Sequence, residues 1–204
     1  MPSPLYLAIA ALSWPAVRLV FRLRAQGLEN LPRSGGYVLA ANHTSNLDPW
    51  PLGLPLFPRR QLRFMAKSEL YWPPLSLVLK AGGAFPVRRG ERDAAAIHTA
   101  TELCRAGEIV VMFPEGTRRK KGLRKKYEAR AHTGAARIAI EAGVPLVPAG
   151  IVGTDRLARL GPLRVAYGEP VRLDDLGTDD LKRASEIATE RLMAEIRRLE
   201  ESLA

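Results

Sequence analysis

Two side chains that can move a proton lie five positions apart near the start of the chain. His43 and Asp48 belong to the segment Asn-His-Thr-Ser-Asn-Leu-Asp, which follows an apolar run at residues 37–41. A neutral imidazole can take a proton from an alcohol near pH 7. A carboxylate bonded to its other ring nitrogen fixes the tautomer and stabilises the resulting imidazolium. We therefore interpret His43 as a general base and Asp48 as the acid that orients it.

The chain offers no nucleophile of its own for a hydrolase triad. It contains no Gly-x-Ser-x-Gly turn, and its one cysteine, Cys104, falls within a predicted helix. The attacking hydroxyl is therefore expected to belong to a substrate. A continuous helix would splay the two side chains apart, so we predict that His43 lies in a strand-to-helix turn and that Asp48 begins the helix. A second interpretation stays open, in which Asp48 is an ordinary helix cap before Pro49 and His43 is structural.

A second segment combines a turn with an arginine. Residues 109–113 are typical of a buried strand, and a Pro-Glu-Gly-Thr-Arg turn at residues 114–118 follows them. The planar guanidinium of Arg118 suits phosphate oxygens, and N–H groups exposed by a glycine turn can add to an anion site. Glu115 can position that arginine through an ion pair. The alternative is an ordinary surface turn with a solvated arginine.

Together these segments resemble the glycerolipid acyltransferases of the lysophosphatidic acid acyltransferase family. The resemblance extends from about residue 27 to about residue 171, and four blocks carry it in the family's order. The blocks are Asn42-His43 with Asp48, Gly83-Ala84-Phe85-Pro86-Val87-Arg88-Arg89-Gly90, Phe113-Pro114-Glu115-Gly116-Thr117-Arg118 and Val144-Pro145-Leu146-Val147-Pro148-Ala149-Gly150.

The resemblance implies a reaction. A fatty acyl group would pass from a thioester donor, acyl-CoA or acyl-carrier protein, to the free hydroxyl of lysophosphatidic acid, giving phosphatidic acid in phospholipid biosynthesis. Other lysolipids and glycerol phosphate are alternative acceptors. A positioned alcohol that is deprotonated as it attacks needs no covalent relay, so we expect neither a metal nor a cofactor beyond the donor.

The resemblance also implies roles for individual residues. His43 would be the general base, and Asp48 would hold it. Pro148 would shape the acyl or acceptor pocket. Bacterial members often carry Asp-Arg where this chain has Arg88-Arg89, so either arginine can be the one that faces the phosphate. The residues implied at the acceptor's phosphate are Arg88, Glu115, Gly116, Thr117 and Arg118.

Other polar groups receive lesser interpretations. The oxyanion that forms on the thioester carbon needs donors, and the N–H groups after Asn42 and in the Gly82-Gly83 turn are candidates. His98 and His132 lack the partner spacing of a metal site and are interpreted as structural or solvated, because no His-Glu-x-x-His or paired Cys-x-x-Cys motif occurs.

Composition indicates one compact domain that meets anionic partners. The 204 residues are 47% hydrophobic, and 31 Lys and Arg against 21 Asp and Glu give a net charge of +10. Seven of the basic residues crowd positions 118–126, which suits lipid headgroups, carrier-protein acidic patches or CoA phosphates. The rival class is a non-enzymatic binder of membranes or nucleic acid. We expect no nucleic acid, because the aromatic content is 6% and no basic-aromatic array, helix-turn-helix or zinc finger appears.

The N-terminus is predicted to touch a membrane. Residues 5–17 carry no charge and include Tyr6 and Trp14 as aromatic anchors, but Pro15 and the arginines from position 18 interrupt the run before a full span. We predict an N-terminal membrane-associating segment at residues 1–26 with a short interfacial helix, and a glycerolipid acyltransferase domain at residues 27–204. A plain core helix is the alternative. The expected location is the cytoplasmic face of the membrane, with peripheral or monotopic attachment.

The elements that must position these groups alternate between short apolar runs and amphipathic stretches. This alternation is typical of an α/β fold, so we predict a single domain with a central, mostly parallel sheet flanked by helices and a C-terminal amphipathic helix. The functional turns then fall at strand ends. The predicted strands are residues 37–41, 62–66, 84–87, 109–113, 146–152 and 163–167, and the predicted helices are residues 74–80, 94–105, 134–142 and 179–203.

Overall fold

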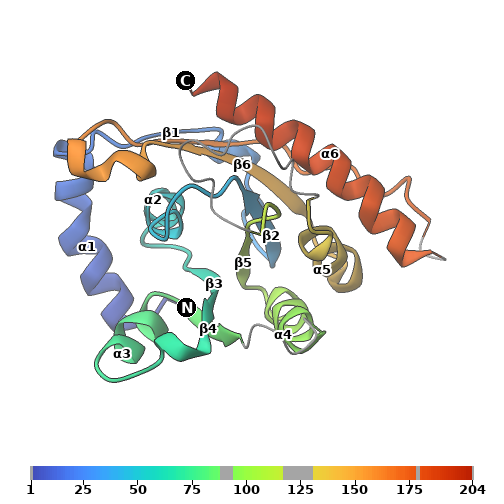
Figure 1. Cartoon of the computed structure of the whole chain (residues 1–204), viewed down its shortest axis with the longest axis horizontal. Coiled ribbons are helices and arrows are strands. Elements are labelled where there is room, and N and C mark those ends of the chain that lie inside the picture. The colour runs from blue at the N-terminus through green and yellow to red at the C-terminus, as the bar shows by residue number, and fades with distance from the viewer. Residues whose placement is uncertain (1, 88–93, 117–130, 178–179, 204) are drawn as a thin grey trace.

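The computed structural model of the chain describes residues 2–87, 94–116, 131–177 and 180–203 (Figure 1). Over these residues the chain forms one seven-stranded sheet in the order β1-β7-β6-β2-β5-β3-β4. Neighbouring strands are parallel throughout the described sheet, except that β6 and β7 are antiparallel. The strands are β1 (Arg24–Gln26), β2 (Tyr37–Ala41), β3 (Leu62–Lys67), β4 (Ala84–Val87), β5 (Ile109–Met112), β6 (Leu146–Val152) and β7 (Arg164–Tyr167).

Helices cover both faces of this sheet (Figure 1). The α-helices are α1 (Pro4–Leu19), α2 (Pro49–Gly53), α3 (Leu75–Ala81), α4 (Ala94–Arg105), α5 (Gly134–Ala142) and α6 (Leu181–Ser202). Short 3₁₀ helices are η1 (Leu28–Asn30), η2 (Leu54–Leu56), η3 (Ser68–Leu70) and η4 (Thr154–Arg159). The predicted α/β fold with a mostly parallel central sheet is therefore confirmed.

The core divides into two layers because successive side chains of a strand point to opposite faces. In β2, Val38 and Ala40 pack against α4, α5 and α6, whereas Leu39 and Ala41 pack on the other face with Leu52 of α2. All these side chains are fully buried. Such strands are apolar on both faces, which is why a continuous apolar run marked them in the sequence.

Two glycines allow close approaches that the fold requires. A Cβ atom on Gly150 in β6 would lie 2.8 Å from the backbone nitrogen of Glu200, so α6 rests directly on the strand at this point. Gly83 has φ +94°, and a Cβ atom there would lie 2.0 Å from the Leu62 carbonyl oxygen. Glycine alone fits both places without a shift of the backbone.

The first helix, α1, has a packed face and an exposed face. Ala10 and Val17 are buried, and Tyr6 and Trp14 pack with them against Leu163. Both aromatic rings are half-buried and pack against this cluster, and their role as membrane anchors stays a prediction. The opposite face carries apolar side chains in solvent, among them Leu12, which is 84% exposed, and Leu19, which is 76% exposed. No helix among the described residues is both long enough and apolar enough to cross a membrane.

Residues 24–26 form a strand that was not predicted. They pair with β7 as β1 at the edge of the sheet. The sequence Arg-Ala-Gln has no apolar alternation. These residues are extended because they pair with β7, and not because of a pattern in their own sequence. The division of the chain at residue 26 into a membrane-associating segment and an acyltransferase domain stays a prediction.

Candidate active site

A buried asparagine fixes the segment that follows β2. Asn42 comes directly after the last residue of β2, and its side chain is fully buried. Its amide nitrogen donates to the Ile151 carbonyl oxygen at 2.9 Å, and its amide oxygen accepts from the Ile151 N–H at 2.8 Å. This pairing continues the contact between β2 and β6 beyond the strand, so His43 leaves the sheet at a fixed place on its carboxyl edge.

His43 and Asp48 form the predicted pair in a strand-to-helix turn. The Nδ1 atom of His43 lies 2.8 Å from Oδ2 of Asp48, and α2 begins directly after Asp48. The carboxylate only accepts, so Nδ1 carries the proton and donates. The lone pair of this tautomer is then on Nε2, the nitrogen that can take a proton from a substrate. The His43 side chain is 18% exposed and that of Asp48 is 0% exposed, so only the imidazole reaches solvent.

The Asp48 carboxylate also organises the loop around it. Oδ2 accepts from the N–H groups of Thr44 at 2.8 Å and Ser45 at 2.9 Å, and Oδ1 accepts from the Thr154 hydroxyl at 2.5 Å. Burial raises the pKa of Asp48, but the hydrogen bonds it accepts, that from His43 foremost, outweigh burial and leave the pKa below its ordinary value of 3.8. The carboxylate is therefore charged at neutral pH.

This arrangement decides between the two interpretations of Asp48. The residue stands at the N-cap position of α2, but its side chain makes no capping bond to the helix. Both oxygens instead face the preceding loop and Thr154. Asp48 is thus the partner of the histidine and not an ordinary helix cap.

Phe113 supports the other side of the imidazole. Its ring stacks on His43 with the centroids 4.1 Å apart and an angle of 18° between the planes. Phe113 follows β5 directly and opens the turn that continues to Glu115 and Gly116. Since β5 is the neighbour of β2 in the sheet, this turn and the histidine lie side by side at the carboxyl edge.

The glycine of this turn faces a second histidine. Gly116 has φ +68°, and a Cβ atom there would lie 2.4 Å from the ring of His132. The His132 N–H also donates to the Pro114 carbonyl oxygen at 2.8 Å. His132 thus packs against the turn at residues 114–116, although it follows that turn by 16 residues in the sequence. The residues next to His132 in the sequence did not predict this contact.

The remaining predicted site residues are placed unevenly. Arg88, Thr117 and Arg118, with the basic stretch at 118–126, lie outside the described residues. Pro148 is buried within β6 opposite Ala40, and its ring packs near Gly168. A proline fits in this central strand because the paired residues of β7 begin only at Ala149.

One pair of oxyanion candidates is excluded. Gly82 donates its N–H to the Val78 carbonyl oxygen at 2.8 Å, and Gly83 donates to that of Lys80 at 3.0 Å. The pair also precedes β4, whereas His43 follows β2, so the two lie at opposite edges of a parallel stretch of the sheet. The N–H groups of Thr44 and Ser45 are likewise used, by Asp48.

Thr154 is the site residue that sequence reasoning missed. It is 106 positions from Asp48, and no local motif marks it. The signal that was available is its place two residues after the end of β6, since residues that follow parallel strands gather at one edge of the sheet. Over the described residues, no group of three or more His, Cys, Asp or Glu side chains is arranged to hold a metal ion.

Known proteins resemble this chain over most of its length. The family model described as Acyltransferase matches residues 22–152. The 1-acyl-sn-glycerol-3-phosphate acyltransferase of Bacillus subtilis is 33% identical over 92% of this chain and 95% of its own length. A chloroplastic 1-acyl-sn-glycerol-3-phosphate acyltransferase of Brassica napus is 30% identical over 72% of this chain and 43% of its own length.

A solved structure extends the agreement to the fold. The crystal structure of the 1-acyl-sn-glycerophosphate acyltransferase from Thermotoga maritima matches with a TM-score of 0.72 and 26% identity, over 98% of this chain and 80% of that one. The matched family region includes β2, β5 and β6, the strands whose ends carry His43, Phe113 and Thr154. The chain therefore belongs to the acyltransferase family and is an enzyme of that class.

Proposed function

We propose that this enzyme transfers a fatty acyl group from a thioester donor to the free hydroxyl of lysophosphatidic acid, giving phosphatidic acid. The observation that carries the proposal is the His43–Asp48 pair, exposed only at its imidazole, at the carboxyl edge of the sheet. The names of the relatives from Bacillus subtilis and Thermotoga maritima support the choice of acceptor.

In the proposed reaction His43 is the general base. Its Nε2 takes the proton from the acceptor hydroxyl as that oxygen attacks the thioester carbonyl carbon. The tetrahedral intermediate then collapses to the new ester, and the thiolate leaves with the proton that His43 returns. The buried charge of Asp48 stabilises the imidazolium between these steps. A general base of this kind contributes about 3 to 5 kcal/mol, a factor of about 10² to 10⁴ in rate.

The acceptor's phosphate is proposed to bind beside this base. Phe113 stacks on His43 and is also the first residue of the turn through Glu115 and Gly116. This turn therefore begins in contact with the imidazole. In lysophosphatidic acid only the glycerol carbons separate the hydroxyl from the phosphate. The acceptor can therefore place its hydroxyl at His43 and its phosphate at the adjacent turn. Thr117 and Arg118 continue the turn in sequence, and we assign Arg88 to the same phosphate. Pro148 is proposed to shape the acyl or acceptor pocket indirectly, by setting the path of the β6 backbone.

A membrane surface is the proposed source of the acceptor. Besides α1, the segment from η3 to α3 exposes large apolar side chains, among them Trp72 at 56% and Leu77 at 63%. The two helices meet through Gln61, which accepts from the Ser3 N–H at 3.2 Å and donates to the Ala81 carbonyl oxygen at 2.6 Å. We propose peripheral binding of this side to the anionic cytoplasmic face, with the net charge of +10 adding attraction.

The proposal is tested by replacing the base. We expect His43→Ala to lower acyl transfer to lysophosphatidic acid by about 10² to 10⁴, because proton transfer is lost, while binding to anionic vesicles persists. Mass spectrometry of the products, with acyl-CoA and acyl-carrier protein as donors and a panel of lysolipids as acceptors, measures both rate and acceptor choice.

His98→Ala is the matched control, since His98 is an exposed histidine of α4 and should leave the rate unchanged. A wild-type rate in the His43→Ala variant would show that His43 is not the general base. Transfer to another lysolipid in preference to lysophosphatidic acid would keep the chemistry and overturn the acceptor.

A further inference from the structure

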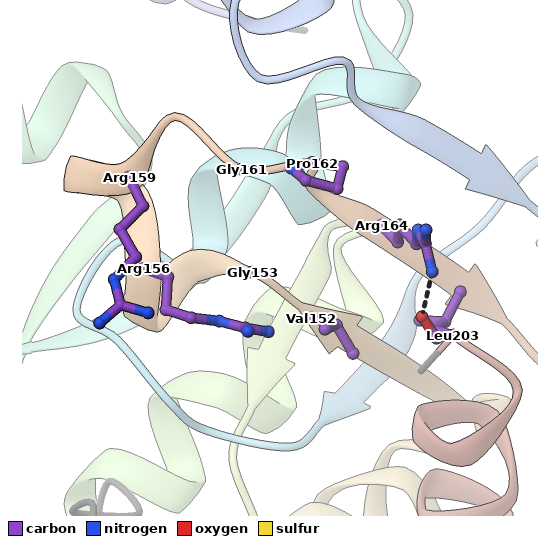
Figure 2. Close-up of a pocket in the computed structure, with 8 residues that line it drawn as sticks. All are labelled: Val152, Gly153, Arg156, Arg159, Gly161, Pro162, Arg164 and Leu203. Carbon is purple, nitrogen blue, oxygen red and sulfur yellow. Dashed lines mark hydrogen bonds between the residues drawn. The ribbon is translucent and has the colours of Figure 1, made fainter.

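A pocket lies beside the candidate active site, at the same edge of the sheet. It has a volume of about 290 Å³ and opens between η4, the start of β7 and the end of α6 (Figure 2). Val152, Pro162 and Leu203 give it apolar walls, and Gly153 and Gly161 add walls without side chains. A pocket of this size is at the lower end of the range for ligand sites, so it can take one end of a large ligand and not the whole.

Three guanidinium groups surround this apolar space. Figure 2 shows Arg156 extended toward Val152, whereas the side chain of Arg159, which also lines the pocket, lies on the opposite side of Arg156 from Val152. Arg164 is held in place, because it donates to the Leu203 carbonyl oxygen at 2.7 Å.

One carboxylate offsets part of this positive charge. Asp155 forms an ion pair with Arg156, at 3.4 Å from its Nε atom. The lining residues include three arginines and no acidic residue, which favours the binding of an anion.

The pocket and the proposed base are joined through consecutive residues. Gly153 in the pocket wall is followed directly by Thr154, whose hydroxyl binds Asp48. The strands that carry the two sites, β6 and β2, are neighbours in the sheet, and neighbouring strands lie about 4.8 Å apart. A flexible ligand anchored in the pocket can therefore extend to His43.

We infer that this pocket binds the nucleotide end of coenzyme A, the carrier of the acyl donor. The inference rests on the proposed function, which requires a thioester donor. Coenzyme A joins a flat adenine base and several phosphates to a long pantetheine arm that ends in the sulfur. The apolar walls accommodate the base, the guanidinium groups of Arg156 and Arg159 bind the phosphates, and the arm carries the thioester to His43.

The test separates the nucleotide from the rest of the donor. The double variant Arg156→Ala with Arg159→Ala is compared with wild type for the Kd of coenzyme A by calorimetry, and for KM with acyl-CoA and with acyl-pantetheine, which lacks the nucleotide. We expect the Kd and the KM for acyl-CoA to rise about tenfold or more, and kcat/KM for acyl-pantetheine to stay unchanged. Both arginines are exposed, so the fold should persist.

A matched control removes two positive charges elsewhere. Arg33 lies before β2 at the amino edge of the sheet, and Lys182 lies at the start of α6, about 32 Å along the helix from Leu203 in the pocket. Arg33→Ala with Lys182→Ala should keep the wild-type Kd for coenzyme A. An equal loss in this control would show a general effect of charge and overturn the assignment of the pocket.

Other outcomes would also overturn the inference. Unchanged affinity for coenzyme A in the double variant would mean that the nucleotide binds elsewhere. A selective loss of transfer from acyl-carrier protein would mean that the arginines serve a protein donor. Calorimetry needs no acceptor, so a wrong choice of lysophosphatidic acid leaves the binding result intact and is recognised separately.

Discussion

Asp48 keeps a negative charge in a place that water does not reach because donors converge on both of its oxygens. Three N–H groups point at Oδ2, from His43, Thr44 and Ser45, and the Thr154 hydroxyl points at Oδ1. The Thr44 hydroxyl lies closer to Thr154 Oγ1, at 2.7 Å, than to Asp48, at 3.3 Å, so it acts mainly on Thr154. A buried carboxylate without such donors would take up a proton and cease to orient the imidazole.

Thr154 gives the sharpest prediction at this scale. Thr154→Val keeps the shape and removes one donor to the carboxylate, so we expect unfolding at pH 7 to cost about 1.5 to 3 kcal/mol less and kcat to fall. The lowered pKa of Asp48 means that its contribution to stability is fully present above 3.8 and is lost as the pH falls through the lower pKa of the folded state. The stability difference between variant and wild type should therefore narrow below pH 3.8.

Urea unfolding at a series of pH values, with steady-state kinetics at pH 7, measures both effects. Thr99→Val is the control, because the Thr99 hydroxyl donates to the Ala95 carbonyl oxygen on the exposed side of α4. A stability difference for Thr154→Val that stays constant down to pH 3 would mean that this hydroxyl does not act through the charge of Asp48.

At the scale of elements, the ends of three neighbouring strands carry the site, and their mutual positions depend on what lies behind them. The pairing of Asn42 with Ile151 fixes the end of β2 against β6. The helix α6 in turn lies on β6, and the two backbones approach closely at Gly150, the residue before the Asn42 partner Ile151. A shift of α6 should therefore change the position of His43.

Gly150→Ala tests this support. The added methyl group would lie 2.8 Å from the backbone nitrogen of Glu200, so the helix must move. We expect a loss of about 1 to 3 kcal/mol in the free energy of unfolding, the usual cost of overpacking, together with a lower kcat. Gly177→Ala is the control, because a Cβ atom there meets nothing within 4 Å. If Gly150→Ala melts like wild type, α6 is not seated on the strand at this residue.

The elements also show which parts of the molecule the sequence could predict. The apolar runs of β2, β5 and β6 have no polar face, so pattern alone located them, and His43 and Asp48 are neighbours in sequence. β1 and Thr154 owe their roles to partners more than 100 residues away, and no local pattern records such partners. The Gly82-Gly83 interpretation was wrong for a reason the sequence contained, since a turn before a parallel strand lies at the amino edge.

At the scale of the whole molecule, the exposed apolar side chains are grouped. α1 presents Leu12 and Leu19, and the segment from η3 to α3 presents Trp72 and Leu77, where Gln61 ties the two helices together. Tyr6 and Trp14, the aromatic anchors predicted from the sequence, are half-buried and pack against the core under α1. Which face of a helix is free depends on the rest of the fold, so the sequence could not show how much of each ring is exposed.

Leu12→Glu tests the membrane surface better than removal of the helix. Deleting α1 would uncover the packing around Val17, whereas Leu12 is 84% exposed and its replacement leaves the core intact. We expect binding to anionic vesicles to weaken about tenfold or more, because one buried leucine contributes about 1.5 to 3 kcal/mol. Sedimentation with vesicles measures this, and activity on acceptor dispersed in detergent should be retained.

Leu28→Glu provides the comparison, since Leu28 of η1 is 40% exposed at another place on the surface. Equal vesicle binding by Leu12→Glu and wild type would move the contact to another part of the surface, such as the basic stretch at 118–126.

The bond between Thr154 and Asp48 joins positions 106 residues apart, and this separation sets an order of events during folding. Contacts between distant positions form late, because long loops must close first. The stretch that bears the imidazole gains its full set of partners only when the end of β6 docks against it. Partly folded chains should consequently have no enzymatic activity. During refolding, activity should recover later than the far-UV circular dichroism signal of the helices.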